Sequence, residues 1–135
     1  MLQRFTDPLV LGQLAVAIFF SILFLQSGLD KVSDWKGNME WLKGHFGKTF
    51  LKGSVPLMTA TITAVELVTG LLAAVGAVVL IVNGCAAYIQ YSLYLAALAF
   101  LMLFFGQRIA KDYAGAASLA IYFGVVMLGL WMVAA

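Results

Sequence analysis

Residues 56–82 read PLMTATITAVELVTGLLAAVGAVVLIV, and this stretch carries a single charged side chain, Glu66. About 20 consecutive apolar residues in a helix cross the hydrocarbon core of a bilayer, so a helix over this stretch is long enough to span it. Three more apolar stretches occur, at about 9–28, 85–106 and 115–134. The sequence therefore predicts four transmembrane helices in one integral membrane domain, residues 1–135.

The composition agrees with a chain whose main solvent is lipid. Hydrophobic residues make up 64% of the chain and charged residues 10%, whereas soluble domains carry about 25% charged residues. Because the connections are short, we expect an all-α, antiparallel four-transmembrane-helix bundle. The net charge of +2 comes from lysines in one loop, which suits a lipid bilayer surface and argues against nucleic-acid binding.

The loop between the first two spans, residues 34–52, has apolar residues at intervals of three and four, which is typical of an amphipathic helix. This stripe consists of Trp35, Met39, Leu42, Phe46 and Phe50. We expect the helix to lie in the head-group plane with its lysines reaching outward. The candidate interface anchors are Trp35, Lys36, Lys43, Phe46 and Lys48. The alternative is a solvated loop whose apolar residues fold back on the bundle.

The connections also predict an orientation in the membrane. Asn83-Gly84 is a tight-turn sequence, so the second and third spans form a close hairpin. Basic residues are concentrated after the first and third spans, at Lys31, Lys36, Lys43, Lys48, Lys52, Arg108 and Lys111, while the other side has Arg4. The positive-inside rule then places both loops in the cytoplasm and both termini in the periplasm.

Glu66 is the main anomaly, because it lies about 16 Å into the second span at 1.5 Å per residue. A charged side chain at such a depth costs about 2.5–3.5 kcal/mol, so it is normally paired or turned toward a cavity. Two interpretations stay open: Glu66 handles a proton or contacts a ligand, or it only hydrogen-bonds neighbouring helices. The candidate polar partners are Arg108, reaching inward from span three, with Gln26 and Tyr122 at a similar level and Lys31 at the cytoplasmic mouth.

A second candidate surface lies on the third span. Tyr88, Tyr91 and Tyr94 follow one another at intervals of three, with Gln90 beside them, so they share one helix face. A quinone ring could stack on this face. The alternative, to which we give more weight, is an interfacial tyrosine belt combined with helix packing.

Motifs for other chemistry are missing from the sequence. Cys85 is the only cysteine, which excludes an internal disulfide or a redox-active cysteine pair. His45 is the only histidine, so neither a bis-histidine haem nor a structural zinc site is expected within one copy. No P-loop, nucleophile elbow or HExxH motif occurs. We therefore expect no metal site and no catalytic motif; quinone is the one cofactor that stays open.

The first two spans carry SGLDK at residues 27–31 and ELVTGLL at residues 66–72. These SG-x-x-K and E-x-x-x-G-L-L patterns, in this order on a four-span chain, resemble the DoxX family over essentially the whole length. The resemblance implies a small bacterial inner-membrane protein, similar to the membrane subunit of thiosulfate:quinone oxidoreductase. It also implies that Lys31 and Glu66 occupy the family's two most recognisable polar positions, with Arg108 as a third.

Three functions follow as hypotheses. The first is an accessory membrane subunit that docks onto other membrane-protein subunits and has no turnover of its own, so that the chain is not itself an enzyme. The second is a quinone-linked redox subunit in which Glu66 handles the accompanying proton. The third is a small carrier or permease. A second copy of the chain is a further candidate partner.

Overall fold

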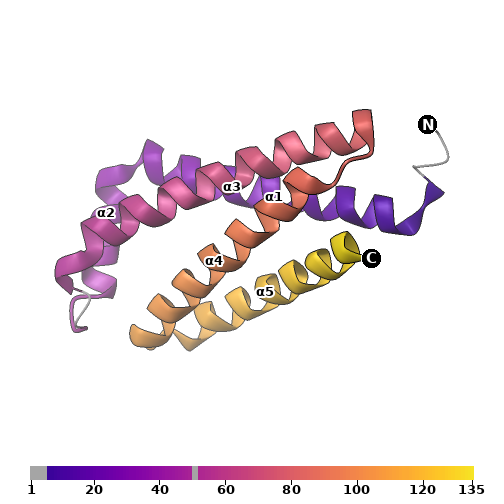
Figure 1. Cartoon of the computed structure of the whole chain (residues 1–135). Helices are drawn as coiled ribbons and strands as arrows, with labels where there is room; N and C mark the ends of the chain where they lie inside the picture. Colours follow the sequence, from indigo (N-terminus) through magenta and orange to yellow (C-terminus); the bar gives the residue numbers. More distant parts are fainter. Residues whose placement is uncertain (1–5, 50–51) are drawn as a thin grey trace.

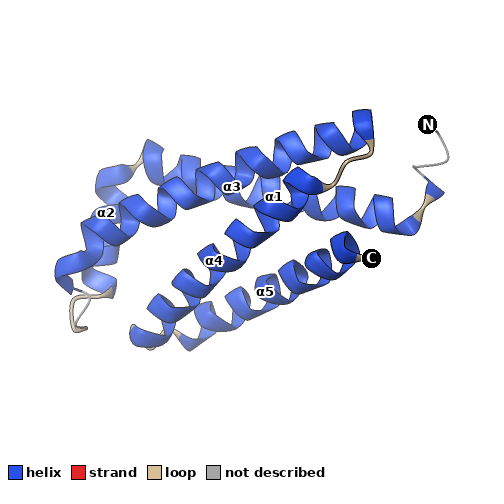
Figure 2. Cartoon of the chain, viewed as in Figure 1, coloured by secondary structure: helices blue, strands red, loops and turns tan. Residues whose placement is uncertain are grey.

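The computed structural model describes residues 6–49 and 52–135, and the regular structure of these residues is entirely helical (Figures 1 and 2). The elements are α1 Pro8–Ser33, α2 Trp35–His45, the short 3-10 helix η2 Lys52–Ser54, α3 Val55–Asn83, α4 Ala87–Ile109 and α5 Tyr113–Ala134. Helices α1, α3, α4 and α5 are long and apolar enough to cross a membrane, which confirms the prediction of four such helices. Arg4, Phe50 and the side chain of Lys52 lie outside the described residues.

Helix α1 begins as the sequence predicts but continues beyond the predicted end at Gly28. The Asp7 carboxylate caps the helix by accepting a hydrogen bond from the Leu9 amide at 3.0 Å, and Pro8 takes the first helical position, which tolerates proline. Gly28 does not end the helix but lies buried within it. A Cβ atom at Gly28 would clash with the Leu67 side chain of α3. The glycine serves close helix packing, and α1 extends to Ser33.

Glycines set the approach of α3 to both of its neighbours. A Cβ atom added at Gly70 would lie 2.9 Å from the backbone nitrogen of Leu25 in α1, and one at Gly76 would lie 2.8 Å from that of Ile89 in α4. Backbone cannot move aside as a flexible side chain can. Small residues at such contacts let membrane helices pack closely, and α3 is thereby the central helix, in contact with α1, α2 and α4.

The predicted turn between the second and third spans is present. Helix α3 ends at Asn83, and Gly84 adopts a left-handed conformation with φ 73°, while its amide donates to the Leu80 carbonyl at 2.9 Å. Glycine is the usual residue in this helix-ending position because it has no Cβ atom to clash with the backbone. Helix α4 then starts at Ala87, and α5 follows with Asp112 as its cap, accepting from the Gly115 amide at 3.0 Å.

The core between α1, α4 and α5 is aromatic. The Phe24 and Phe100 rings lie 5.1 Å apart between centroids, and Phe20 lies 5.8 Å from each of them. Tyr122 of α5 stacks on Phe100 at 5.7 Å. These offset and tilted contacts are the arrangements that aromatic side chains prefer, so Tyr122 belongs to this core.

Helix α2 is shorter than the predicted segment of residues 34–52. Asp34 ends α1 and caps α2 by accepting from the Gly37 amide at 3.3 Å, and α2 ends at His45, before Gly47. Met39 and Phe46 of the predicted apolar stripe are buried, and with Leu42 they pack around Val55 and Met58 at the start of α3. Met39, Leu42 and Phe46 of the stripe therefore face the protein, whereas Trp35 is exposed.

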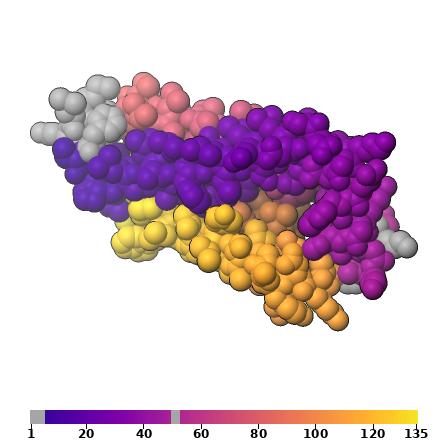
Figure 3. All heavy atoms as spheres, turned by 180° about the vertical axis from the view of Figure 1, so that it is seen from behind, coloured from indigo at the N-terminus to yellow at the C-terminus, as the bar shows by residue number. Residues whose placement is uncertain are grey.

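The elements have two distinct ends. The start of α1, the end of α5 and the α3–α4 connection lie at one end, while α2, η2 and the α4–α5 connection lie at the other (Figure 1). On the face seen in Figure 3, α1 and α5 run side by side. The outer surfaces are apolar: Ile22, Leu57, Val78, Ile121 and Trp131 are each at least 58% exposed. Such a surface suits lipid or a protein partner rather than water.

We predict that Gly70→Ala lowers stability by about 1–3 kcal/mol, because the added methyl group meets α1 backbone and over-packs the contact. Gly124→Ala in α5 is the matched control, since no atom lies within 4 Å of a Cβ atom there. Thermal unfolding of the purified chains in detergent measures both. Equal melting temperatures for the two variants would show that the α1–α3 approach tolerates a methyl group.

Candidate functional site

The candidate site is an ionic cluster that joins α1 to α3. The Lys31 ammonium donates to Glu66 Oε2 at 3.0 Å, to Glu66 Oε1 at 3.3 Å and to Ser27 Oγ at 2.9 Å. The Ser27 hydroxyl in turn donates to Glu66 Oε2 at 3.0 Å. Both carboxylate oxygens thus accept hydrogen bonds, and the two charges form an ion pair.

Local structure explains why these three side chains meet. Ser27 and Lys31 are four residues apart in α1, so they lie on one helix face. That face exists only because α1 continues past Gly28 as a helix. The contact between Gly28 and Leu67 then brings the two backbones close enough for a serine side chain to reach Glu66. The cluster and the close approach are therefore one feature of the α1–α3 contact.

Burial makes this pair energetically important. The Glu66 side chain is 2% exposed and that of Lys31 18% exposed. Removing one member of a buried ion pair leaves an uncompensated charge and costs about 3–5 kcal/mol. Among the described residues, every buried side-chain nitrogen or oxygen atom has a hydrogen-bond partner. Chemically, the arrangement holds two helices together, with Glu66 buried and with Ser27 and Lys31 partly exposed.

The polar threonines of α3 satisfy themselves within the helix. Thr59 donates to the Val55 carbonyl at 2.7 Å, and Thr63 donates to the Thr59 carbonyl at 2.7 Å. Thr69 donates to the Val65 carbonyl at 2.6 Å. Back-bonding to the carbonyl four residues earlier is the usual way for threonine to sit inside an apolar helix. None of these hydroxyls contributes to the ionic cluster.

The other predicted partners of Glu66 lie elsewhere. The Arg108 guanidinium stacks over the Tyr113 ring, 4.4 Å from its centroid. Gln26 is exposed on α1, and Tyr122 lies in the aromatic core. Glu66 is paired instead with Lys31, which the sequence places at the cytoplasmic mouth, and with Ser27, known from sequence only as part of a motif. The four-residue spacing of Ser27 and Lys31 is the signal that points to this face.

The tyrosine face does not share a site with Glu66. Tyr88, Tyr91 and Tyr94 are each at least 43% exposed on the outside of α4. The Tyr91 and Tyr94 rings lie 6.4 Å apart between centroids, and Gln90 donates to the Tyr94 hydroxyl. This surface faces outward, while the Glu66 carboxylate faces α1.

The predicted interface anchors divide into two groups. Trp35, Lys36, Lys43 and Lys48 are exposed, whereas Phe46 is buried. His45, at the end of α2, pairs through Nε2 with Gln107 Oε1 of α4 at 2.9 Å and stacks on Trp41, 4.6 Å between ring centroids. The His45–Gln107 contact ties the end of α2 to α4.

The described residues hold no group of three or more His, Cys, Asp or Glu side chains that could bind a metal ion. Comparisons of the chain with family models, with curated proteins and with solved structures found no match. The DoxX resemblance therefore stays a prediction that rests on its two motifs. In the structure those motifs meet, because Ser27, Gly28 and Lys31 of the first contact Glu66 and Leu67 of the second.

We predict that Lys31→Met lowers the free energy of unfolding by about 3 kcal/mol, because it leaves the Glu66 carboxylate buried and unpaired. The double variant Lys31→Met, Glu66→Met is expected to recover most of that loss, since it removes both charges. Equilibrium unfolding in a mixed-detergent titration measures both chains. Lys36→Met, which removes an exposed lysine of α2, is the control and should unfold like the parent chain.

A double variant that is no more stable than Lys31→Met would contradict the coupling of Lys31 to Glu66, since removing the second charge would then recover nothing.

Proposed function

We propose that this chain is a multi-pass membrane protein that acts as an accessory subunit of a larger membrane complex and has no turnover of its own. One observation carries the proposal: the buried charges are engaged in joining α1 to α3. Glu66 accepts from Ser27 and Lys31 and is 1% exposed. A carboxylate held in this way serves as a helix-to-helix contact, so the chain is suited to be a rigid framework.

Helix α5 is the favoured docking element for the partner. It is the least buried of the four apolar helices, with 17% of its most apolar stretch buried against 39% for α3. Its outer face combines the exposed residues Ile121 and Trp131 with Gly124, which has no atom within 4 Å of a Cβ position. A partner helix could approach such a face closely.

We further propose that the four long helices form an antiparallel bundle in a bacterial inner membrane, with the α2 end in the cytoplasm. The lysines at this end support the orientation by the positive-inside rule, and Trp35, Lys36 and Lys43 are exposed there. Helix α2 then lies at the membrane interface with its buried stripe on α3 and its lysines toward the head groups.

Cysteine labelling tests this orientation. Cys85 is exposed next to the α3–α4 turn, so a membrane-impermeant maleimide added to intact spheroplasts is expected to modify it. The matched variant with Cys85→Ser and Lys43→Cys carries its thiol at the opposite end and should react only in inverted vesicles. Labelling of this variant in intact spheroplasts, with the parent chain protected, would reverse the proposed orientation.

Co-purification tests the accessory role. The tagged chain, extracted from native membrane in mild detergent, is expected to retain a larger membrane complex, and Gly124→Trp should release it. Val78→Trp is the matched control, since Val78 is 60% exposed on α3 and lies away from the α5 face. Recovery of the chain alone, or only with a second copy of itself, would contradict the proposal.

A quinone-linked role is the second candidate, and one observation favours it: Lys31 lines a pocket as well as pairing with Glu66. In this version Glu66 exchanges a proton during quinone reduction by a partner. Glu66→Gln is expected to lower quinone-dependent electron transfer of the assembled complex. Unchanged electron transfer in that variant would remove this candidate and leave the accessory role intact.

A further inference from the structure

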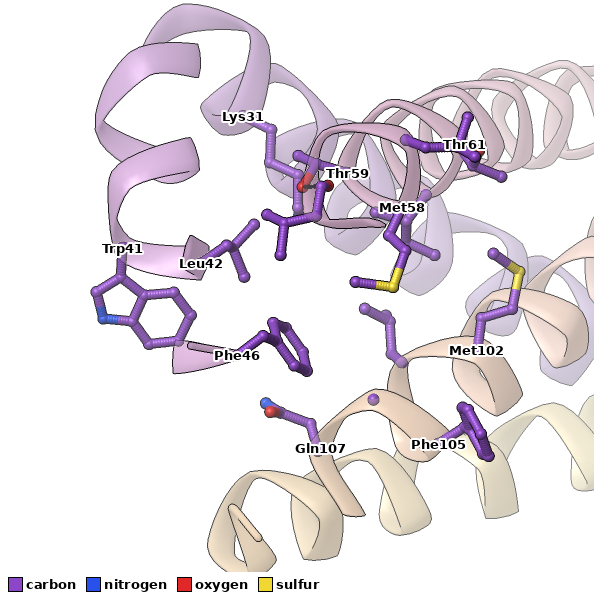
Figure 4. Close-up of a pocket in the computed structure, with 15 residues that line it drawn as sticks. Lys31, Trp41, Leu42, Phe46, Met58, Thr59, Thr61, Met102, Phe105 and Gln107 are labelled. Atoms are coloured by element: carbon purple, nitrogen blue, oxygen red, sulfur yellow. Dashed lines mark hydrogen bonds between the residues drawn. The ribbon is translucent and has the colours of Figure 1, made fainter. Parts of the chain in front are cut away.

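A pocket of about 380 Å³ lies between α2, the first turns of α3 and the last turns of α4 (Figure 4). Small-molecule sites usually measure about 300–1,000 Å³ and are mostly apolar with a few placed polar groups. This pocket matches that description. Its apolar wall includes Leu42 of α2 and Phe46, which directly follows α2, Met58 and Ile62 of α3, and Met102 and Phe105 of α4.

The lining includes the polar side chains of Lys31 of α1, Thr59 and Thr61 of α3, and Gln107 of α4, and Lys31 and Gln107 lie on opposite sides of the pocket (Figure 4). Gln107 uses Oε1 in its contact with His45, and no described residue accepts a hydrogen bond from its Nε2. The hydroxyl of Thr59, which also lines the pocket, already donates to the Val55 carbonyl. The three hydrogens of the Lys31 ammonium are already donated to Ser27 and to both Glu66 oxygens, so a ligand that brings an acceptor would bind to Gln107 Nε2.

Charge narrows the class of ligand. The Lys31 ammonium lies 3.0 Å from the Glu66 carboxylate, so the pair is neutral as a whole. An anionic head group beside Lys31 would add a negative charge next to Glu66 in a medium that screens poorly. A cationic head group would meet the Lys31 ammonium itself. An uncharged carbonyl oxygen can accept a hydrogen bond from Gln107 Nε2 without placing a charge beside Glu66 or Lys31.

The outer edge of the pocket opens toward the surface that faces lipid in a spanning chain. Leu57 and Phe105 line the pocket and are 73% and 59% exposed. Thr61, which also lines the pocket, is exposed as well. An apolar tail leaving the pocket at this edge would pass directly into the bilayer.

We propose that this pocket binds a membrane-soluble amphipathic molecule with an uncharged, carbonyl-bearing head group, held by Gln107 beside the Lys31–Glu66 pair, and an apolar tail that leaves past Leu57 and Phe105. An isoprenoid-type quinone and a neutral acylglycerol both have this chemistry. Binding needs no partner protein and no redox turnover, so it goes beyond the accessory role and can fail or succeed independently of it.

Tryptophan fluorescence provides the test, because Trp41 lines the pocket and quinones quench indole emission. The full chain with Trp35→Phe and Trp131→Phe reports from Trp41 alone, and the chain with Trp35→Phe and Trp41→Phe reports from Trp131 in α5. A decyl-tailed benzoquinone is titrated into each chain in nanodiscs. Saturable quenching of Trp41, with only linear quenching of Trp131, is the expected result.

Two variants and two competitors sharpen this test. Thr61→Phe narrows the lipid-facing edge from an exposed position and should raise the half-saturating quinone concentration about tenfold. Ala64→Phe, exposed one turn along α3 and outside the lining, should leave it unchanged. Displacement by mono-oleoylglycerol assigns neutral carbonyl amphipaths in general, and its failure assigns quinones. Two results would overturn the proposal. Either oleate displaces the quinone as effectively as mono-oleoylglycerol does, or Trp41 and Trp131 show equal, linear quenching.

Discussion

A lysine and a glutamate can stay inside a set of apolar helices when each neutralises the other. In this chain the Lys31–Glu66 pair joins α1 to α3 at 3.0 Å, with Ser27 completing the hydrogen bonds. The pair requires that α1 remain helical beyond Gly28 and that the two backbones approach closely. The length of α1, the position of Gly28 and the placement of the two charges on α1 and α3 are therefore linked through this one ion pair.

Helix α3 is approached by α1 and α4, whereas α5 packs on α4 and α1. Gly76 lets α4 approach from one side, as Gly70 lets α1 approach from another. The α3 threonines hydrogen-bond to carbonyls of their own helix, so they require no partner from a neighbour. Hydroxyls satisfied within their own helix, together with an ion pair that joins α1 to α3, are the arrangement expected where water is absent. It leaves the outer faces free for lipid or protein.

Lys31 connects this framework to the pocket. Its ammonium belongs to the buried pair, while its side chain lines the cavity beneath α2. The cavity wall is completed by the α2 segment, which Met39 and Phe46 attach to Val55 and which His45 attaches to Gln107. A molecule in this pocket would therefore lie beside one member of the ionic contact.

The sequence by itself determined the four helices long and apolar enough to cross a membrane, the Asn83-Gly84 turn and the anomaly at Glu66, because hydropathy, length and turn chemistry are local properties of the chain. It also placed Ser27 and Lys31 one turn apart. Only the tertiary structure decided that Lys31, rather than Arg108, pairs with Glu66, that Phe46 is buried, and that α2 walls a pocket. These outcomes depend on the distance between two helix axes. That distance is set by which glycine of one helix lies against which residue of the next, and the sequence of a single segment does not specify this pairing.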